Sequence, residues 1–113
     1  MKKVILDTSF ILTCLKQKID FFEELKLMGI LILIPKQVIV ELKGVDKSGL
    51  ALKLLENNSF EKIDINMKNV DQGIINYGKE NPKVIIATLD KEIKTKTKNS
   101  KVIVREKSRL EVI

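Results

Sequence analysis

The sequence contains no histidine. The protein therefore has no imidazole that could act as a general base or activate a serine or cysteine nucleophile, and it lacks the usual ligand of zinc. Any metal ion that it binds is therefore expected to be a hard cation held by oxygen atoms, such as Mg²⁺, Mn²⁺ or Ca²⁺. The carboxylates become the main groups that can carry chemistry.

Cysteine and long apolar runs are also scarce. The single cysteine, Cys14, excludes an internal disulfide, and its place on an apolar stripe indicates a small buried side chain. The longest apolar run, residues 28–34, is far too short to span a bilayer, so no membrane partner is expected. Lys2-Lys3 before an apolar stretch resembles the start of a signal peptide, but Asp7 interrupts that stretch. We therefore expect a cytoplasmic protein.

Lysine dominates the charged residues. Lys and Arg together number 21 against 15 Asp and Glu, which gives a formal net charge of +6. A basic chain suits a polyanionic partner, although a solvated basic surface has the same composition. With 113 residues, 44% of them hydrophobic, the chain is expected to fold as one domain, residues 1–113, around a core of Leu, Ile and Val.

The apolar pattern alternates between short strand-like runs and helical spacing. It predicts strands at 4–6, 30–34, 60–65, 84–88, 102–104 and 110–113. It predicts helices from Thr8 or Ser9 to about 17, and at 20–29, 35–44, 48–56, 69–78 and 90–98, with Pro35 in a first helical position and Gly44 as a stop. The alternation predicts an α/β fold with a parallel sheet, helices on both faces, a turn at 106–108 and an antiparallel final edge strand.

Four acids occupy positions where they can meet. Asp7 and Asp90 directly follow strands, and chemistry in parallel sheets lies just beyond the carboxyl ends of the strands. Glu41 and Asp71 lie on or beside the buried faces of their helices. Each acid also has a simpler interpretation. Asp7 and Asp90 can cap helices, Glu41 can pair with a lysine, and Asp71 can interact with the helix dipole.

The free energies involved show what it would mean if the four acids lay close together. A cap or dipole interaction contributes about 1 kcal/mol. Two carboxylates at about 4 Å repel by roughly 4 kcal/mol at an effective dielectric constant of about 20. If the four acids converge, local stability is not the reason for them, and a divalent cation is the natural counterion.

Four segments, in order and at suitable spacings, resemble one family. The chain resembles PIN-domain ribonucleases over essentially its whole length, through Val4-Ile5-Leu6-Asp7-Thr8-Ser9, Ile34-Pro35 followed by Val38-Ile39-Val40-Glu41-Leu42, Val70-Asp71-Gln72-Gly73-Ile74, and Ala87-Thr88-Leu89-Asp90-Lys91-Glu92-Ile93-Lys94. The final segment and the last helix look closer to archaeal relatives of the small-subunit pre-rRNA processing nuclease than to VapC-type toxins. Many family members have two adjacent aspartates where this chain has Asp71-Gln72, which departs from the pattern.

The resemblance implies a three-layer fold, a sheet ordered 3-2-1-4-5 with a short extra C-terminal edge strand, and cleavage of single-stranded RNA, with ribosomal RNA as a candidate substrate. It also implies one or two Mg²⁺ or Mn²⁺ ions. By this reading the catalytic and metal-binding residues are Asp7, Glu41, Asp71 and Asp90. Ser9 and Thr88 would orient carboxylates. Glu92 is a candidate fifth acid, but an exposed glutamate in a first helical turn is the simpler interpretation.

Three lysines near the end of the chain suggest how RNA could bind. Lys91, Lys94 and Lys98 are spaced to share one face of a helix, where they could contact phosphates. A solvated helix face is the alternative.

Other functions also fit parts of the pattern. A PIN-like module could bind RNA or a ribosome-assembly partner without cutting it, if Gln72 impairs catalysis. A toxin with an antitoxin partner has the same fold and chemistry. A phospho-receiver domain also has an aspartate after a strand, but it needs an acidic pair after the first strand, and here Thr8-Ser9 follow Asp7. A homodimer stays open.

Overall fold

A computed structural model describes residues 1–106 and 109–113. Within these residues six strands form one sheet, in the order β3-β2-β1-β4-β5-β6. The first five are parallel, and β6 runs antiparallel to β5 at the edge. The predicted fold class, strand order and antiparallel edge strand are confirmed. The strands are β1 (Lys2–Leu6), β2 (Ile30–Pro35), β3 (Glu61–Ile63), β4 (Ile85–Ala87), β5 (Lys101–Arg105) and β6 (Arg109–Val112).

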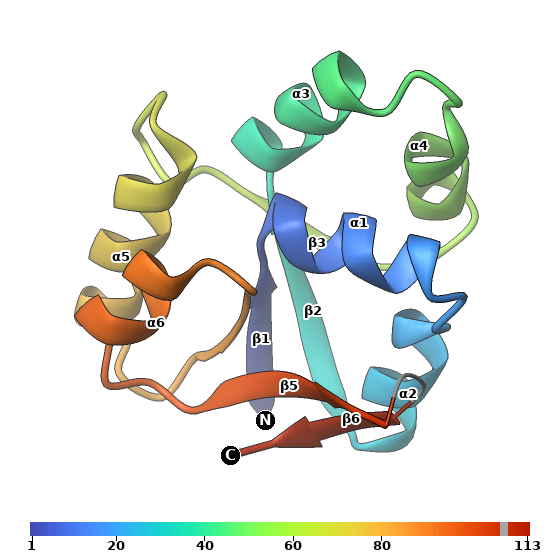
Figure 1. The fold of residues 1–113 in the computed structure, drawn as a ribbon. Coiled ribbons are helices and arrows are strands. Elements are labelled where there is room, and N and C mark those ends of the chain that lie inside the picture. Colours follow the sequence, from blue (N-terminus) through green and yellow to red (C-terminus); the bar gives the residue numbers. More distant parts are fainter. Residues whose placement is uncertain (107–108) are drawn as a thin grey trace.

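Helices cover both faces of the sheet. In Figure 1, α5 and α6 lie on the left of β1, and α1, α2 and α4 lie on the right. None of the helices in the described residues is both long and apolar enough to cross a membrane. The helices are α1 (Thr8–Lys16), α2 (Phe21–Leu27), α3 (Lys36–Val45), α4 (Leu50–Glu56), α5 (Val70–Glu80) and α6 (Lys91–Lys96).

The central strand β1 places the residues that follow it. Val4, Ile5 and Leu6 are completely buried, as a continuous apolar strand inside a parallel sheet should be. Leu6 lies beside Ala87 of β4, and the Asp7 amide donates a hydrogen bond to the Ala87 carbonyl at 3.0 Å. The chain segments that follow β1 and β4 therefore emerge side by side.

The last helix is shorter than predicted. It was expected to reach about Lys98, but α6 ends at Lys96 because Thr97 adopts an extended backbone with φ −126° and ψ 144°. The Thr97 hydroxyl donates to the Ile93 carbonyl at 2.6 Å, which satisfies a carbonyl in the last turn. Lys98 consequently belongs to the link between α6 and β5.

Other predicted boundaries also differ. Pro35 ends β2 and caps α3 with an extended ψ of 139°, instead of occupying the first helical position. Gly44 lies inside α3, which ends one residue later, at Val45. The strands expected at 60–65 and 84–88 are each only three residues long, Glu61–Ile63 and Ile85–Ala87. Of the turn expected at 106–108, residues 107 and 108 lie outside the described residues.

Candidate active site

Asp7 is buried at the carboxyl end of β1, with 3% of its surface exposed. Its Oδ1 accepts a hydrogen bond from the Thr8 amide at 2.8 Å. Its Oδ2 accepts from the hydroxyls of Ser9 at 2.9 Å and Thr88 at 2.7 Å. Burial raises the pKa of Asp7 above its usual value, and the charge of Glu41 adds to this, while the three hydrogen bonds oppose it. The carboxylate is held rigidly in a place where its charge is costly.

The hydroxyls of Thr88 and Ser9 connect the ends of β1 and β4. The Thr88 hydroxyl donates to Asp7 and accepts from the Asp90 amide at 3.0 Å. The Ser9 hydroxyl likewise donates to Asp7 and accepts from the Leu89 amide at 3.1 Å. Each hydroxyl uses both its donor and its acceptor capacity. Together they fix the Asp7 carboxylate against the segment that carries Asp90.

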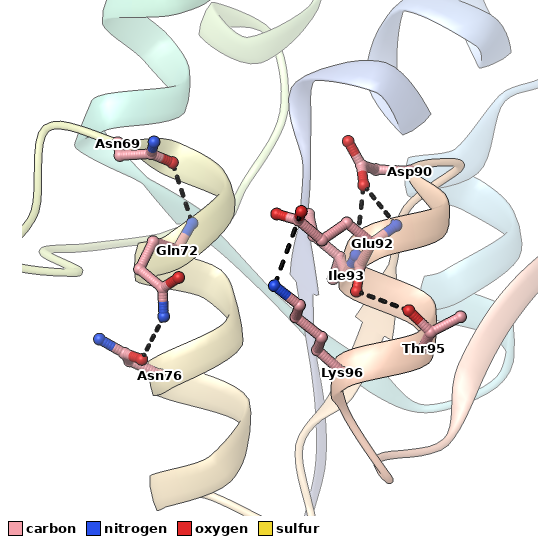
Figure 2. A network of polar contacts seen from close by, with 8 residues as sticks. All are labelled: Asn69, Gln72, Asn76, Asp90, Glu92, Ile93, Thr95 and Lys96. Atoms are coloured by element: carbon pink, nitrogen blue, oxygen red, sulfur yellow. Dashed lines mark hydrogen bonds and ion pairs between the residues drawn. The ribbon is translucent and has the colours of Figure 1, made fainter.

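Asp90 begins α6 as its N-cap. Its Oδ1 accepts from the Glu92 amide at 2.8 Å and the Ile93 amide at 3.2 Å (Figure 2). This cap is the simple interpretation of an aspartate at this position. The cap does not exclude a role in the site, because the same carboxyl group also acts on Asp71 across the space between α6 and α5.

Asp71 lies in the first turn of α5. The Asn69 side chain caps this helix, because its Oδ1 accepts a hydrogen bond from the Gln72 amide at 3.0 Å. The pKa of Asp71 is raised to about 6, first by burial and then by the charges of Asp90, Asp7 and Glu41, and a hydrogen bond with Asp90 also favours the protonated form. Asp71 therefore lies close enough to the other three predicted acids for their charges to raise its pKa.

Glu41 differs from the other three acids in its exposure. It lies on α3 between the buried Val38 and Leu42, but its own side chain faces solvent. Its charge still raises the pKa values of Asp7 and Asp71, so it faces the same space. The lysine partner that would have explained a glutamate here is not found among the described residues.

The acid cluster has no basic counterion within residues 1–106 and 109–113. The ion pairs found there join Lys36 with Asp64, Lys96 with Glu92 and Arg105 with Glu111. Nor do three acids of this part of the chain gather closely enough to form a ready-made metal-binding group. Like charges disfavour close approach of such acids to one another when no cation is present. Carboxylate oxygens without a cationic partner fit a hard divalent ion, provided that the side chains move inward around it.

Two residues flagged by the sequence lie beside the cluster. The Gln72 side chain does not substitute for a second carboxylate; its Nε2 donates to Asn76 Oδ1 at 2.8 Å along α5 (Figure 2). Glu92 is exposed and forms an ion pair with Lys96 at 3.6 Å, which agrees with its simpler interpretation. Neither contact involves Asp7 or Asp90.

The predicted lysine ridge is not one helix face. Lys91 and Lys94 lie on α6, but Lys98 lies beyond its end. Lys94 instead faces Lys101, whose pKa is lowered by burial and then by the charge of Lys94. Sequence reasoning also missed Asn99, a buried side chain that joins three backbone carbonyls. A single polar residue before a strand gave no periodic signal that could have revealed it.

Comparison with family models gives the class of protein. Residues 4–107 match the family described as PIN like domain, and the chain belongs to this family. It is 33% identical to "Ribonuclease VapC4" of Methanocaldococcus jannaschii over 99% of this chain and 97% of that protein. Among solved structures, it is similar to that of "the PIN domain endonuclease Utp24", with a TM-score of 0.83, 28% identity, and coverage of 97% of this chain and 90% of the other. The resemblance to PIN-domain nucleases predicted from the sequence is confirmed.

The raised pKa values predict how stability depends on pH without metal. Because Asp71 and Asp7 have higher pKa values in the folded state than in the unfolded chain, the folded protein binds more protons above about pH 4. Stability should therefore fall as the pH rises above about 4, and the part of it that comes from Asp71 should be lost as the pH passes about 6. Urea denaturation in chelator across this range measures the effect.

The Asp71→Asn variant is the control for this pH dependence, because it removes the group with a pKa of about 6. Its stability should vary less between pH 4 and 6 than that of the wild type. Asp64 acts in the opposite sense and at lower pH: its pKa is lowered to about 2, so its contribution is lost only below about pH 4. Equal slopes in the two proteins would contradict the assignment to Asp71.

Proposed function

We propose that this protein is a metal-dependent endoribonuclease that cleaves single-stranded RNA. The observation that carries the proposal is the cluster of Asp7, Glu41, Asp71 and Asp90, which has no basic counterion in the described residues. Burial, together with the charges of the other three acids, raises the pKa of Asp71 to about 6. Similarity to proteins named as a ribonuclease and as a PIN domain endonuclease supports it. Such a cluster costs free energy unless a cation binds to it.

Each part of the site has a role in this proposal. Asp7, Glu41, Asp71 and Asp90 would hold one or two Mg²⁺ or Mn²⁺ ions, which lower the pKa of bound water and offset negative charge on the leaving oxygen. The hydrogen bonds from Ser9 and Thr88 orient the Asp7 carboxylate and favour its ionised form, against the effect of burial. The lysines of α6, Lys91 and Lys94, would attract the RNA backbone.

A toxin function is the second candidate, because the curated relative is named "Ribonuclease VapC4". The chemistry would be the same, with an antitoxin as the partner and growth arrest as the outcome. Processing of ribosomal RNA is the other role that the sequence resemblance suggests. Expression with and without the product of the neighbouring gene, followed by sequencing of the cleaved RNA ends, separates the two roles.

A cleavage assay tests the shared chemistry. Labelled single-stranded RNA incubated with the protein should be cut internally with Mn²⁺ or Mg²⁺ and should stay intact in chelator. Asp7→Asn should lose activity by more than about a hundredfold, because changing residues that merely orient metal ligands already costs about 10- to 100-fold. The products are resolved on a denaturing gel.

Asp20→Asn is the matched control for this assay. Asp20 is an exposed N-cap at α2 and undergoes the same loss of charge away from the cluster, so cleavage should be unchanged. Cleavage that persists in chelator would contradict metal dependence. Metal-independent RNA binding with no cleavage in Mn²⁺ would instead identify a binding module.

A further inference from the structure

A cavity of about 320 Å³ lies at the C-terminal ends of α5 and α6. Three lysines, a glycine, a proline and an asparagine line it, and no acid of the described residues is among them. The lining residues are Gly78, Lys79, Pro82, Lys96, Lys98 and Asn99. Lys79 belongs to the last turn of α5, Lys96 ends α6, and Lys98 follows α6. Positive charges from separate segments therefore surround one hollow, although like charges there repel each other.

Asn99 lines this cavity and joins the chain segments around it. Its Nδ2 donates to the carbonyls of Gly78 at 3.0 Å, Asn81 at 3.0 Å and Val84 at 2.8 Å. These bonds tie the segment after α6 to the end of α5. Because Nδ2 faces the carbonyls, the amide's other atom, Oδ1, is its acceptor. The buried Asn99 is therefore the one lining residue of the cavity whose side chain carries an amide acceptor.

Gly78 makes this close approach feasible. A Cβ atom at this position would lie 2.8 Å from Ile86 Cδ1 and 3.1 Å from Asn99 Oδ1, so a side chain would push the segment after α6 away. The cavity thus depends on specific packing and not on chance exposure of lysines.

The cavity lies along the same pair of helices as the acids. Figure 2 shows α5 and α6 side by side, with Asn69 and Asp90 at one end and Lys96 toward the other. Lys79 follows Asp71 by eight residues on α5, so the two are about 12 Å apart along the axis, at about 1.5 Å per residue. At about 3.4 Å per stacked nucleotide, this separation corresponds to three or four nucleotides.

We propose that this cavity binds one nucleotide of the substrate strand, three or four nucleotides from the cleaved bond, and so anchors the RNA. The proposal rests on the proposed function. The phosphate contacts Lys79 and Lys98 at the rim, and the sugar or base lies over Gly78 and Pro82, where Asn99 Oδ1 accepts a hydrogen bond. The size fits one nucleotide, since cavities for whole small-molecule ligands begin at about 300 Å³.

The test compares two double variants with equal loss of charge. Lys79→Gln with Lys98→Gln removes two ammonium groups from the cavity and keeps the Lys96–Glu92 ion pair. Lys47→Gln with Lys53→Gln removes two exposed lysines at and before α4. Fluorescence anisotropy in chelator measures binding to oligoribonucleotides of two and ten nucleotides at several salt concentrations, and thermal melts check folding.

The cavity variant should bind the ten-nucleotide RNA on the order of tenfold more weakly at about 0.1 M salt, with a salt slope smaller by about 1, whereas the control should match the wild type. A dinucleotide can occupy the cavity but cannot also reach the acids, so it should bind more weakly than the ten-nucleotide RNA, and its binding should fall in the cavity variant but not in the control. Equal weakening in both double variants means that only net charge matters and overturns the proposal, as does a wild type that binds no RNA.

The proposed function is judged by a different measurement, cleavage of RNA in Mn²⁺. A wild type that binds the ten-nucleotide RNA through the cavity but does not cut it would contradict the nuclease proposal and leave the anchor standing. A wild type that cuts RNA, together with a cavity variant that binds RNA as well as the control does, would support the nuclease proposal and contradict the anchor.

Discussion

Replacing Asp90 by asparagine should abolish RNA cleavage and, without metal, should raise the melting temperature. The change removes one charge from a cluster in which Asp90 is the leading charge that raises the pKa of Asp71. Repulsion between nearby carboxylates reaches roughly 4 kcal/mol at about 4 Å, which exceeds the about 1 kcal/mol of a cap. Asparagine can still accept the amides of Glu92 and Ile93. The metal-free variant should therefore melt at a higher temperature, by a few degrees for each kcal/mol of repulsion that the change removes.

Addition of Mn²⁺ should reverse this order. At a hundredfold excess over its dissociation constant, the ion contributes about 2.7 kcal/mol to the protein that binds it. The measurement is a set of thermal melts of wild type and variant, in chelator and in Mn²⁺, beside the cleavage assay. Asp20→Asn, with the same change at an exposed cap, should show neither the gain in chelator nor the loss in Mn²⁺. An Asp90→Asn protein that melts lower in chelator, with no response to Mn²⁺ in either protein, would make Asp90 only a structural cap.

The second large effect is expected at Asn99. Asn99→Asp keeps the shape of the side chain but replaces the Nδ2 donor by a carboxylate oxygen that faces three carbonyls. Buried acceptors without donors, next to an added charge, should cost about 3 kcal/mol or more. The melting temperature should fall by about 10 °C or more for a domain of this size. Urea denaturation near pH 7 gives the free energy of unfolding.

Asn58→Asp is the matched control for this measurement. Its Nδ2 donates to one carbonyl, that of Leu54 at 2.8 Å, near the end of α4. The same chemical change should therefore cost only about 1–2 kcal/mol. Similar losses at both positions would show that Asn99 does not hold α5 and the segment after α6 together.

The sequence by itself determined the elements and their order. Val4-Ile5-Leu6 predicted a strand buried on both faces because it is short, apolar and partly β-branched, and all three residues are completely buried. Alternation of such strands with helical spacing predicted the parallel sheet. The strand order came from the family resemblance, and the structure has the same order. Two strand-end acids were predictable as well, since aspartates follow β1 and β4 directly in the chain.

The tertiary structure alone decided how side chains distant in sequence act on one another. The pKa of Asp71 reaches about 6 because the fold partly buries it and brings charges from three other segments near it, and no local pattern contains that information. Likewise, α6 ends at Lys96 because Thr97 is extended, and Asn99 then binds carbonyls near the end of α5 and the start of β4. Helical spacing therefore predicted Lys98 on the same helix face as Lys91 and Lys94, whereas it lies beyond the end of α6. Local periodicity specifies backbone conformation and buried faces, whereas electrostatic fields and cavities arise only after long-range packing has placed the segments.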